Sequence, residues 1–377
     1  MAIETLLDFR SPDTCKRLVI KIGSNLLVDG EGRLRTEWLR TVVLEVKTAR
    51  DRGQEVVIVS SGAIALGAAK MGIEGGGRST LSEAQACAAV GQIALASAWS
   101  DLLAEQDLLA AQMLLTLDDF ESRRRYLNAS ATFDRLLSEG VVPVVNENDT
   151  IAVSEIRFGD NDRLAARVAQ ACTADGVILL TDVDGLYDRH PNEPGAERLS
   201  QVRGVTDEIH AMASAESGSS VGTGGMTSKL LAAEIAERAG IALAIMNGSE
   251  DVPMSRALAA NSATLFLPKR GDSARKAWIG GRLRFAGSIT VDQGCVDALR
   301  ENKSLLAAGI TGVEGKFERG DVIPVHAPDG RMIAKGVVEY EWHEVEVIKG
   351  RSGIELRTIL GYAPRAAVIH RDHLVML

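Results

Sequence analysis

The sequence predicts an α/β protein in which helices cover both faces of a mostly parallel sheet, followed by a smaller β-rich domain. Three observations lead to this prediction. Over the first two-thirds of the chain, short apolar segments alternate with longer segments of helical periodicity, a pattern typical of parallel sheets buried on both faces. Near residue 270 the pattern changes to short β-type segments separated by glycine-rich turns. The length, 377 residues, also suits two domains better than one core.

The elements of the first part follow from apolar spacing and from the residues that end each segment. Apolar residues recur at helical spacing from Thr36 to Arg52, and Gly53 is well suited to end that helix. Pro143 lies inside an apolar run, so its strand must place it where no backbone donor is required. Strands are expected at residues 17–21, 55–59, 108–115, 141–145, 176–180 and 241–246. Helices are expected at 36–52, 63–70, 82–103, 124–138, 164–172 and 228–239.

The C-terminal part reads as a small β-rich barrel. A polar stretch from Lys269 to Lys276 is a plausible linker. We therefore expect a first domain at residues 1–270, a linker at 271–285 and a second domain at 286–377. The strands expected in the second domain are 288–291, 322–326, 333–338, 345–348 and 367–369.

Composition and charge exclude several classes of protein. Hydrophobic residues make up 46% of the chain and charged residues 25%, the balance of a soluble globular protein. We find no apolar run of the roughly 18 to 20 residues that a membrane span needs and no secretory signal, so no membrane partner is expected. The formal net charge of −9 disfavours a general nucleic-acid binder. The four cysteines are scattered, which predicts reduced thiols and a cytoplasmic location.

Polar motifs follow four of the predicted strands at the point where each strand ends. They are Lys21–Asn25, Ser60–Ala63, Asn146–Asp149 and Thr181–Gly185. Because ligands of open parallel sheets bind at the carboxyl ends of the strands, these four motifs are expected to converge on one small-molecule site.

The glycine-rich segment from Gly222 to Lys229 is the sharpest single motif. Its glycines would let backbone N–H groups approach an anion, and the helix that follows would direct its positive end at the same anion. With Lys21 and Lys229, this arrangement suits the β- and γ-phosphates of a nucleotide. It is neither a Walker A loop nor a GxGxxG motif. The alternative is a flexible surface loop that caps a helix.

A group of carboxylates and an amide precedes the helix predicted from residue 164. Asp160, Asn161 and Asp162, with Asp149 upstream, could bind an ammonium group and orient a catalytic lysine, although one of them would serve as an ordinary helix cap. Ser61 could seat a substrate carboxylate, or its segment could be a plain turn. Asp182 and Asp184 could touch a nucleotide or form a turn. The six histidines are dispersed, so no metal site is assigned.

Taken as a set, these motifs resemble the glutamate 5-kinase family of the amino acid kinase superfamily. The segments that carry the resemblance are Lys21–Ser24, Val59–Ala65, Val145–Asp149, Gly159–Asp162, Leu180–Asp182, Gly185–Tyr187 and Gly222–Met226. The C-terminal segments Gly287–Asp292, Gly315–Val322 and Ile359–Tyr362 resemble a PUA domain. The resemblance implies a three-layer αβα sandwich and transfer of the γ-phosphoryl group of ATP to the side-chain carboxylate of glutamate, the first step of proline synthesis.

The resemblance also implies roles for single residues. Lys21 and Lys229 would hold the phosphates and stabilise the transferring group, and Asp162 would orient both lysines. Ser61, Asp149 and Asn161 would bind glutamate. The ATP site would be lined by Lys21, Thr181, Asp182, Thr223, Gly224, Gly225, Met226, Thr227, Ser228 and Lys229. Magnesium would travel with the ATP, proline is implied as a feedback inhibitor, and a homo-oligomer, a dimer or a tetramer, is expected.

Two other readings stay open on the sequence. Another amino acid kinase, such as an aspartate or N-acetylglutamate kinase, would share this chemistry, although Asp149 and the carboxylates near Asp162 suit a free α-amino group. An RNA-binding protein is the alternative from a different class, because PUA-type domains often bind RNA. From residue 286 onward 11 Lys and Arg face 13 Asp and Glu, a formal balance of −2, which does not favour a strong phosphate-binding surface.

Overall fold

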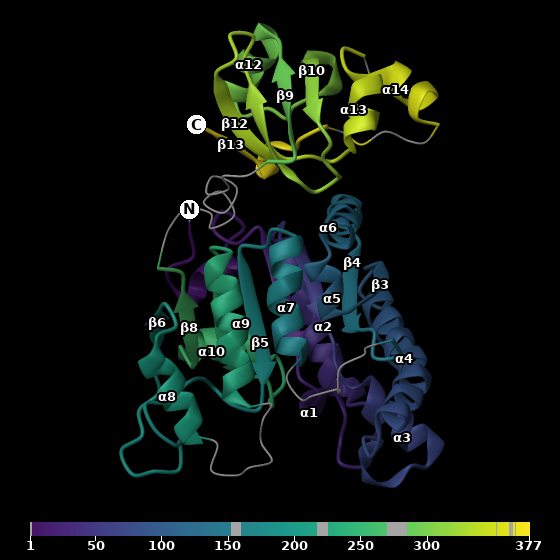
Figure 1. The fold of residues 1–377 in the computed structure, drawn as a ribbon. Helices are drawn as coiled ribbons and strands as arrows, with labels where there is room; N and C mark the ends of the chain where they lie inside the picture. Colours follow the sequence, from purple (N-terminus) through teal and green to yellow (C-terminus); the bar gives the residue numbers. More distant parts are fainter. Residues whose placement is uncertain are drawn as a thin grey trace. The chain divides into compact units, whose positions relative to one another are not determined.

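The computed structural model of the chain describes residues 2–151, 160–216, 225–269, 285–351, 353–361, 365 and 367–377. The chain divides into two compact units. One contains residues 1–121 and 128–271, and the other contains residues 122–127 and 272–377. Each unit has a sheet of its own (Figure 1).

The sheet of the first unit has eight strands in the order β3-β4-β2-β1-β5-β7-β8-β6. Their bounds are β1 Arg17–Ile22, β2 Glu55–Val59, β3 Ala110–Leu115, β4 Val142–Glu147, β5 Gly176–Thr181, β6 Gln201–Arg203, β7 Ala242–Asn247 and β8 Ala263–Leu267. All neighbouring strands pair in parallel except β7 and β8, which are antiparallel. The predicted mostly parallel sheet is therefore confirmed, and the sequence missed only the short strands β6 and β8.

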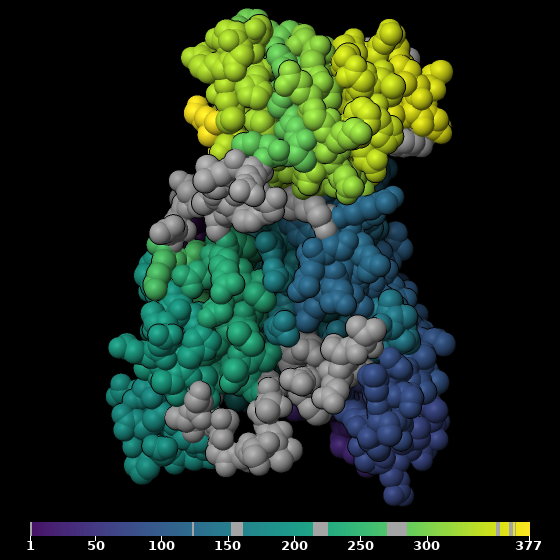
Figure 2. All heavy atoms as spheres, viewed as in Figure 1, coloured from purple at the N-terminus to yellow at the C-terminus, as the bar shows by residue number. Residues whose placement is uncertain are grey.

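Helices cover both faces of this sheet, as predicted. Helices α7 and α9 pack together over β1, β5 and β7, whereas α2 and α10 belong to the opposite face (Figure 1). The two helices also lie side by side on the surface that the space-filling view shows (Figure 2). The helices that lie wholly in this unit are α1 Ser24–Leu27, α2 Thr36–Asp51, α3 Ala63–Met71, α4 Leu81–Ala104, α5 Leu117–Glu121, α7 Asp160–Ala171, α8 Asp207–Glu216, α9 Met226–Arg238 and α10 Pro253–Ala260. Helix α6, Arg123–Ser138, belongs to this unit from residue 128 onward.

Helix α4 is long and apolar enough to cross a membrane, by length and composition alone. The expectation that no apolar segment reaches this length is therefore wrong for α4. One such helix is weak evidence of a span, because the core helix of a globular protein passes the same test. Leu95, Trp99 and Leu103 of α4 are buried in the core of the first unit.

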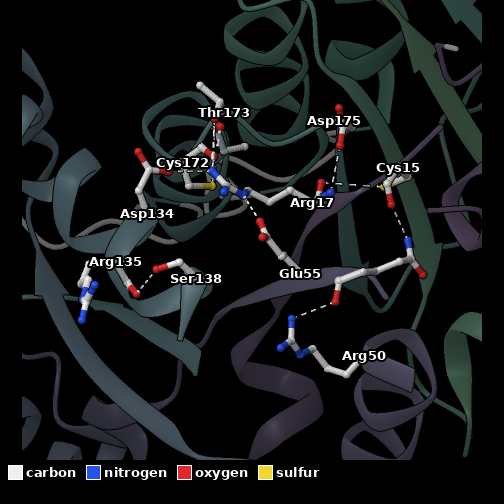
Figure 3. A network of polar contacts seen from close by, with 12 residues as sticks. Cys15, Arg17, Arg50, Glu55, Asp134, Arg135, Ser138, Cys172, Thr173 and Asp175 are labelled. Carbon is white, nitrogen blue, oxygen red and sulfur yellow. Dashed lines mark hydrogen bonds and ion pairs between the residues drawn. The ribbon is translucent and has the colours of Figure 1, made fainter. Parts of the chain in front are cut away.

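The amino ends of the strands are joined by a polar network around Arg17 (Figure 3). Its guanidinium pairs with Glu55 at 2.7 Å and Asp134 at 3.0 Å, and its backbone N–H donates to Asp175 at 2.8 Å. The buried side chain of Gln54 donates to the backbone carbonyls of Phe9 and Cys15 at 2.8 and 2.7 Å. These bonds attach residues 6–15, for which the sequence offered no role, to the edge opposite the strand ends that carry the polar motifs.

The second unit contains the sheet β10-β9-β11-β12-β13 and a core of its own. Its strands are β9 Gly287–Val291, β10 Ile310–Gly315, β11 Val322–His326, β12 Met332–Val337 and β13 Leu374–Met376, and its α-helices are α12 Gln293–Arg300, α13 Trp342–Ile348 and α14 Gly353–Leu360.

Two of the predicted strands of this unit are wrong. Residues 345–348 belong to α13, because Glu341 and Glu344 form a capping box at its start and Val345 and Ile348 share its buried face. Residues 367–369 contribute one isolated bridge, between Ile369 and Leu305.

Candidate active site

Two lysines from different elements meet on one buried carboxylate. Lys21 Nζ, from β1, lies 2.5 Å from Asp162 Oδ1, and Lys229 Nζ, from α9, lies 3.2 Å from Asp162 Oδ2. Asp162, on α7, is 1% exposed, and the lysines are 6% and 7% exposed. Lys21 is the next-to-last residue of β1, so the cluster lies near the carboxyl end of that strand. The predicted convergence of Lys21, Lys229 and Asp162 is thus present in the structure.

The electrostatics of this cluster favour the charged form of Asp162. Burial raises the pKa of the Asp162 carboxyl, but the two ammonium groups outweigh burial and hold that pKa below its ordinary value. One carboxylate facing two lysines leaves a formal excess of one positive charge in a buried position. A buried positive charge of this kind calls for an anionic partner.

A chain of amide and hydroxyl groups lies beside the lysine cluster. Asn161, which precedes Asp162 on α7, donates through Nδ2 to Ser61 Oγ at 2.9 Å and to Asn146 Oδ1 at 3.4 Å. Asn146, at the end of β4, donates in turn to Gln92 Oε1 of α4 at 2.7 Å. Ser61 and Asn161, both expected to bind substrate, are therefore in direct contact.

Asp149 lies after β4 and is buried, at 8% exposure. Asp149 interacts electrostatically with the guanidinium of Arg78, which lies in the loop before α4. Burial lowers the pKa of Arg78, and the negative charge of Asp149 opposes that effect. The sequence offered no reason to single out Arg78, because a lone arginine in a glycine-rich loop carries no motif. The side chain of Asp160 lies outside the described part of the chain.

Three helices at this edge of the sheet begin after glycine. The residues before α1, α3 and α9 are Gly23, Gly62 and Gly225, and none of the three helix starts has a side-chain cap. By contrast, Thr80 caps α4 by accepting from the backbone N–H of Glu83. Uncapped N–H groups and the positive end of a helix suit anions. Helix α9 begins at Met226, two residues before the predicted start at residue 228.

The start of α3 is held in place by close packing against α4. A Cβ atom on Gly67 would lie 1.8 Å from the carbonyl oxygen of Cys87, and one on Gly91 would lie 1.8 Å from the carbonyl oxygen of Ala63. Only glycine allows the two backbones to approach this closely. The packing thereby sets the position of Ser61 and of the first turn of α3.

Of the residues expected to bind ATP, Thr181 and Asp182 lie at the carboxyl end of β5 and Gly225 to Lys229 lie at the start of α9. Thr181 Oγ1 donates to Asp182 Oδ1 at 3.0 Å, and Asn25 Nδ2 lies 3.5 Å from Asp182 Oδ2. Gly225 and Thr227 are exposed, whereas Met226, Ser228 and Lys229 are buried. Thr223 and Gly224 lie outside the described residues.

Asp184, expected either to touch a nucleotide or to form a turn, makes contacts with nearby side chains. It lies 3.4 Å from Arg198 and accepts from the Tyr187 hydroxyl at 3.1 Å. These contacts hold Asp184 within its own loop region and leave both interpretations of it as predictions.

An open, mostly parallel sheet with a buried Lys–Asp–Lys cluster and helix starts preceded by glycine at its carboxyl edge is typical of a phosphoryl-transfer enzyme. The profile of the amino acid kinase family matches residues 16–247, and that of the PUA domain matches residues 287–360. Among curated proteins, the glutamate 5-kinase of Novosphingobium aromaticivorans is 58% identical over the full length of both chains. That of Sphingopyxis alaskensis is 54% identical over 97% of this chain and 99% of its own. The chain belongs to the glutamate 5-kinase family, which confirms the resemblance.

Among solved structures, the carbamate kinase from Giardia lamblia bound to AMP-PNP is 16% identical. It matches 67% of this chain and 98% of its own, with a TM-score of 0.47.

Proposed function

We propose that this chain transfers the γ-phosphoryl group of ATP to the side-chain carboxylate of L-glutamate, giving L-glutamyl 5-phosphate in the first step of proline biosynthesis. Its membership of the glutamate 5-kinase family supports this reaction. The observation in the structure that carries the proposal is the buried carboxylate of Asp162 with Lys21 and Lys229 on its two oxygens.

The chemistry matches the residues that the site contains. A glutamate side chain is already ionised at neutral pH, with a reference pKa of about 4.3, so its attack needs no general base. The difficulty is to bring two anions, the carboxylate and the triphosphate, within reach of each other. Phosphoryl transfer depends on positioning and charge neutralisation, and two lysines beside uncapped helix starts supply both.

Roles for single residues are part of the proposal. Lys21 and Lys229 hold the phosphates and stabilise the transferring group, and Asp162 orients the two lysines. The other residues divide into a glutamate site, formed by Ser61, Asp149 and Asn161, and an ATP site, formed by Lys21, Thr181, Asp182 and residues 223–229. Ser61 supports this division, because its oxygen accepts from Asn161 and its hydroxyl can donate its own proton to a substrate carboxylate.

Magnesium is proposed to arrive with the nucleotide. Within the described residues no group of three or more His, Cys, Asp or Glu could hold a metal ion, and the two oxygens of Asp162 are taken by lysines. Mg²⁺ commonly binds through substrate phosphates and water. Bound in that way, it would neutralise phosphate charge while Lys21 and Lys229 act on the transferring group.

The proposal also covers oligomeric state, cellular location, inhibition by proline, RNA binding and domain limits. A homo-oligomer is supported by the large apolar side chains of Ile93 on α4 and Leu109 before the edge strand β3, which are 74% and 68% exposed. A cytoplasmic location is supported by four free, buried cysteines. Proline is proposed as a feedback inhibitor, and any RNA binding by the second unit is proposed to be weak. The proposed domain limits are 1–270 and 286–377, with a linker at 271–285.

ADP release and hydroxamate trapping test the reaction. The purified chain is supplied with MgATP and, in separate reactions, L-glutamate, L-aspartate or N-acetyl-L-glutamate, with and without proline. We expect ADP release and a trapped hydroxamate with L-glutamate alone. Turnover of aspartate or N-acetylglutamate in place of glutamate would reject the proposed substrate in favour of another amino acid kinase.

A further inference from the structure

A partly buried chain of side-chain amides runs from helix α4 to the proposed glutamate site. Gln92 Oε1 accepts from Asn146 Nδ2 at 2.7 Å, and Asn146 Oδ1 lies 3.4 Å from Asn161 Nδ2. Asn161 Nδ2 also donates to Ser61 Oγ at 2.9 Å. Gln92 is separated from Asn161, a residue assigned to the substrate, by Asn146 alone. No sequence motif includes Gln92.

The orientation of each side-chain amide follows from one backbone N–H group, which can donate a hydrogen bond but cannot accept one. The backbone N–H of Glu147 lies 2.9 Å from one side-chain atom of Asn146, so that atom must be the carbonyl oxygen Oδ1. The other end of the Asn146 amide is then the NH₂ group, which requires an acceptor. Asn146 is 2% exposed, so water does not readily serve, and Gln92 Oε1 supplies the acceptor.

The same logic extends to Asn161. Because Asn146 turns its oxygen toward Asn161, the facing atom of Asn161 is its NH₂ group, which also donates to Ser61. The oxygen of Asn161, Oδ1, is therefore turned the other way. Among the described residues it is buried and has no hydrogen-bond partner. A buried carbonyl oxygen without a hydrogen-bond donor is unfavourable, so a ligand that supplies a donor at this position would be stabilised.

We propose that Gln92 is a positioning residue for substrate recognition, acting through Asn146 to keep the Asn161 oxygen available for the α-ammonium group of the amino acid. The inference rests on the proposed function, since it assigns that acceptor to the ammonium group of glutamate. Without Gln92, the buried NH₂ group of Asn146 must turn to find another acceptor. Asn161 then loses its fixed partner, and its NH₂ group can take the position of its oxygen, where it repels an ammonium group.

The test compares L-glutamate with glutarate, the same five-carbon diacid without the α-ammonium group. Gln92→Leu removes the acceptor, Gln92→Glu keeps an oxygen facing Asn146, and Gln112→Leu makes the same chemical change at an exposed position on β3. The measured quantity is the ratio of kcat/KM for glutamate to kcat/KM for glutarate, together with the KM for ATP. Thermal unfolding checks that each variant is folded.

We expect Gln92→Leu to raise the KM for glutamate and to lower the glutamate-to-glutarate ratio about tenfold, with an unchanged KM for ATP. Gln92→Glu and Gln112→Leu should keep the wild-type ratio. A ratio that stays at the wild-type value in Gln92→Leu, or that falls equally in Gln92→Glu, overturns the inference. A wild-type enzyme that does not phosphorylate glutamate refutes the proposed function instead, so the two failures are distinguishable.

Discussion

Lys21 Nζ lies 2.5 Å from Asp162 Oδ1, which joins the first strand of the sheet to helix α7 through a buried ion pair. The pair would be a costly feature if stability were its only purpose, because desolvating two charges offsets most of their attraction. Lys229 on the second oxygen of Asp162 makes the cluster net positive. The arrangement therefore suits a binding site for a further anion.

Removing either lysine should abolish most of the activity. At about 4 Å and an effective dielectric constant near 20, one contact between unit charges is of order 4 kcal/mol before desolvation is subtracted. Lys21→Ala and Lys229→Ala should therefore each lower kcat by up to about three orders of magnitude. Glutamate-dependent ADP release measures the loss. Lys47→Ala, which removes a partly exposed lysine paired with Asp51, is the matched control. Near-wild-type turnover in either site variant would refute the assignment.

Replacing Asp162 should destabilise the protein in a pH-dependent way. Asp162→Asn leaves two buried ammonium groups without their carboxylate, a change expected to cost about 3–5 kcal/mol near neutral pH. The folded-state pKa of Asp162 lies below 3.8, so its contribution to stability is present above that pH and is lost as the pH falls through the folded value. Urea unfolding of both proteins from pH 7 to pH 3 measures the difference. A gap between them that does not narrow at the acid end would contradict the predicted linkage.

Crowding the contact between α3 and α4 should impair both stability and glutamate binding. Gly67→Ala places a methyl group where the Cys87 carbonyl oxygen lies 1.8 Å away, so the helices must separate. We expect a loss of about 1–3 kcal/mol or more and a raised KM for glutamate, because α3 carries the turn that follows Ser61. Gly30→Ala serves as the control, since its Cβ would meet no heavy atom within 4 Å. Equal melting temperatures for the two variants would show that the contact is not tight.

The cysteines should be inert in the folded protein. Burial raises the pKa of the Cys15 and Cys172 thiols to about 12 and that of Cys295 to about 11, and all four cysteines are free. Ellman's reagent at pH 8 should react with four thiols in urea and with almost none in the native state. Because the folded pKa values exceed the ordinary 9.0, this contribution to stability is complete below pH 9 and is lost as the pH rises toward 12. Rapid labelling of native Cys15 or Cys172 would disprove the predicted burial.

Much of the first unit was predictable because its strands are apolar runs with clear ends. Strand β2 has the predicted bounds, as does β11 in the second unit. The segment 345–348 was misassigned because Val-Glu-Val-Ile fits a strand and a helix equally over four residues. The start signal that decides between them lies in Glu341 and Glu344, upstream of the apolar residues.

The sequence by itself determined the fold class, since apolar periodicity and polar strand ends are local features of the chain. It also led us to expect Lys21, Lys229, Asp162, Ser61 and Asn161 as site residues, and the structure brings the first three together and the last two into contact. Only the tertiary structure decided which lysine meets which carboxylate oxygen, how Gln92 reaches the site through Asn146, and that Arg78 lies near Asp149. Those relationships join residues far apart in the chain, and such contacts depend on the register and packing of whole elements, which no local pattern of residues encodes.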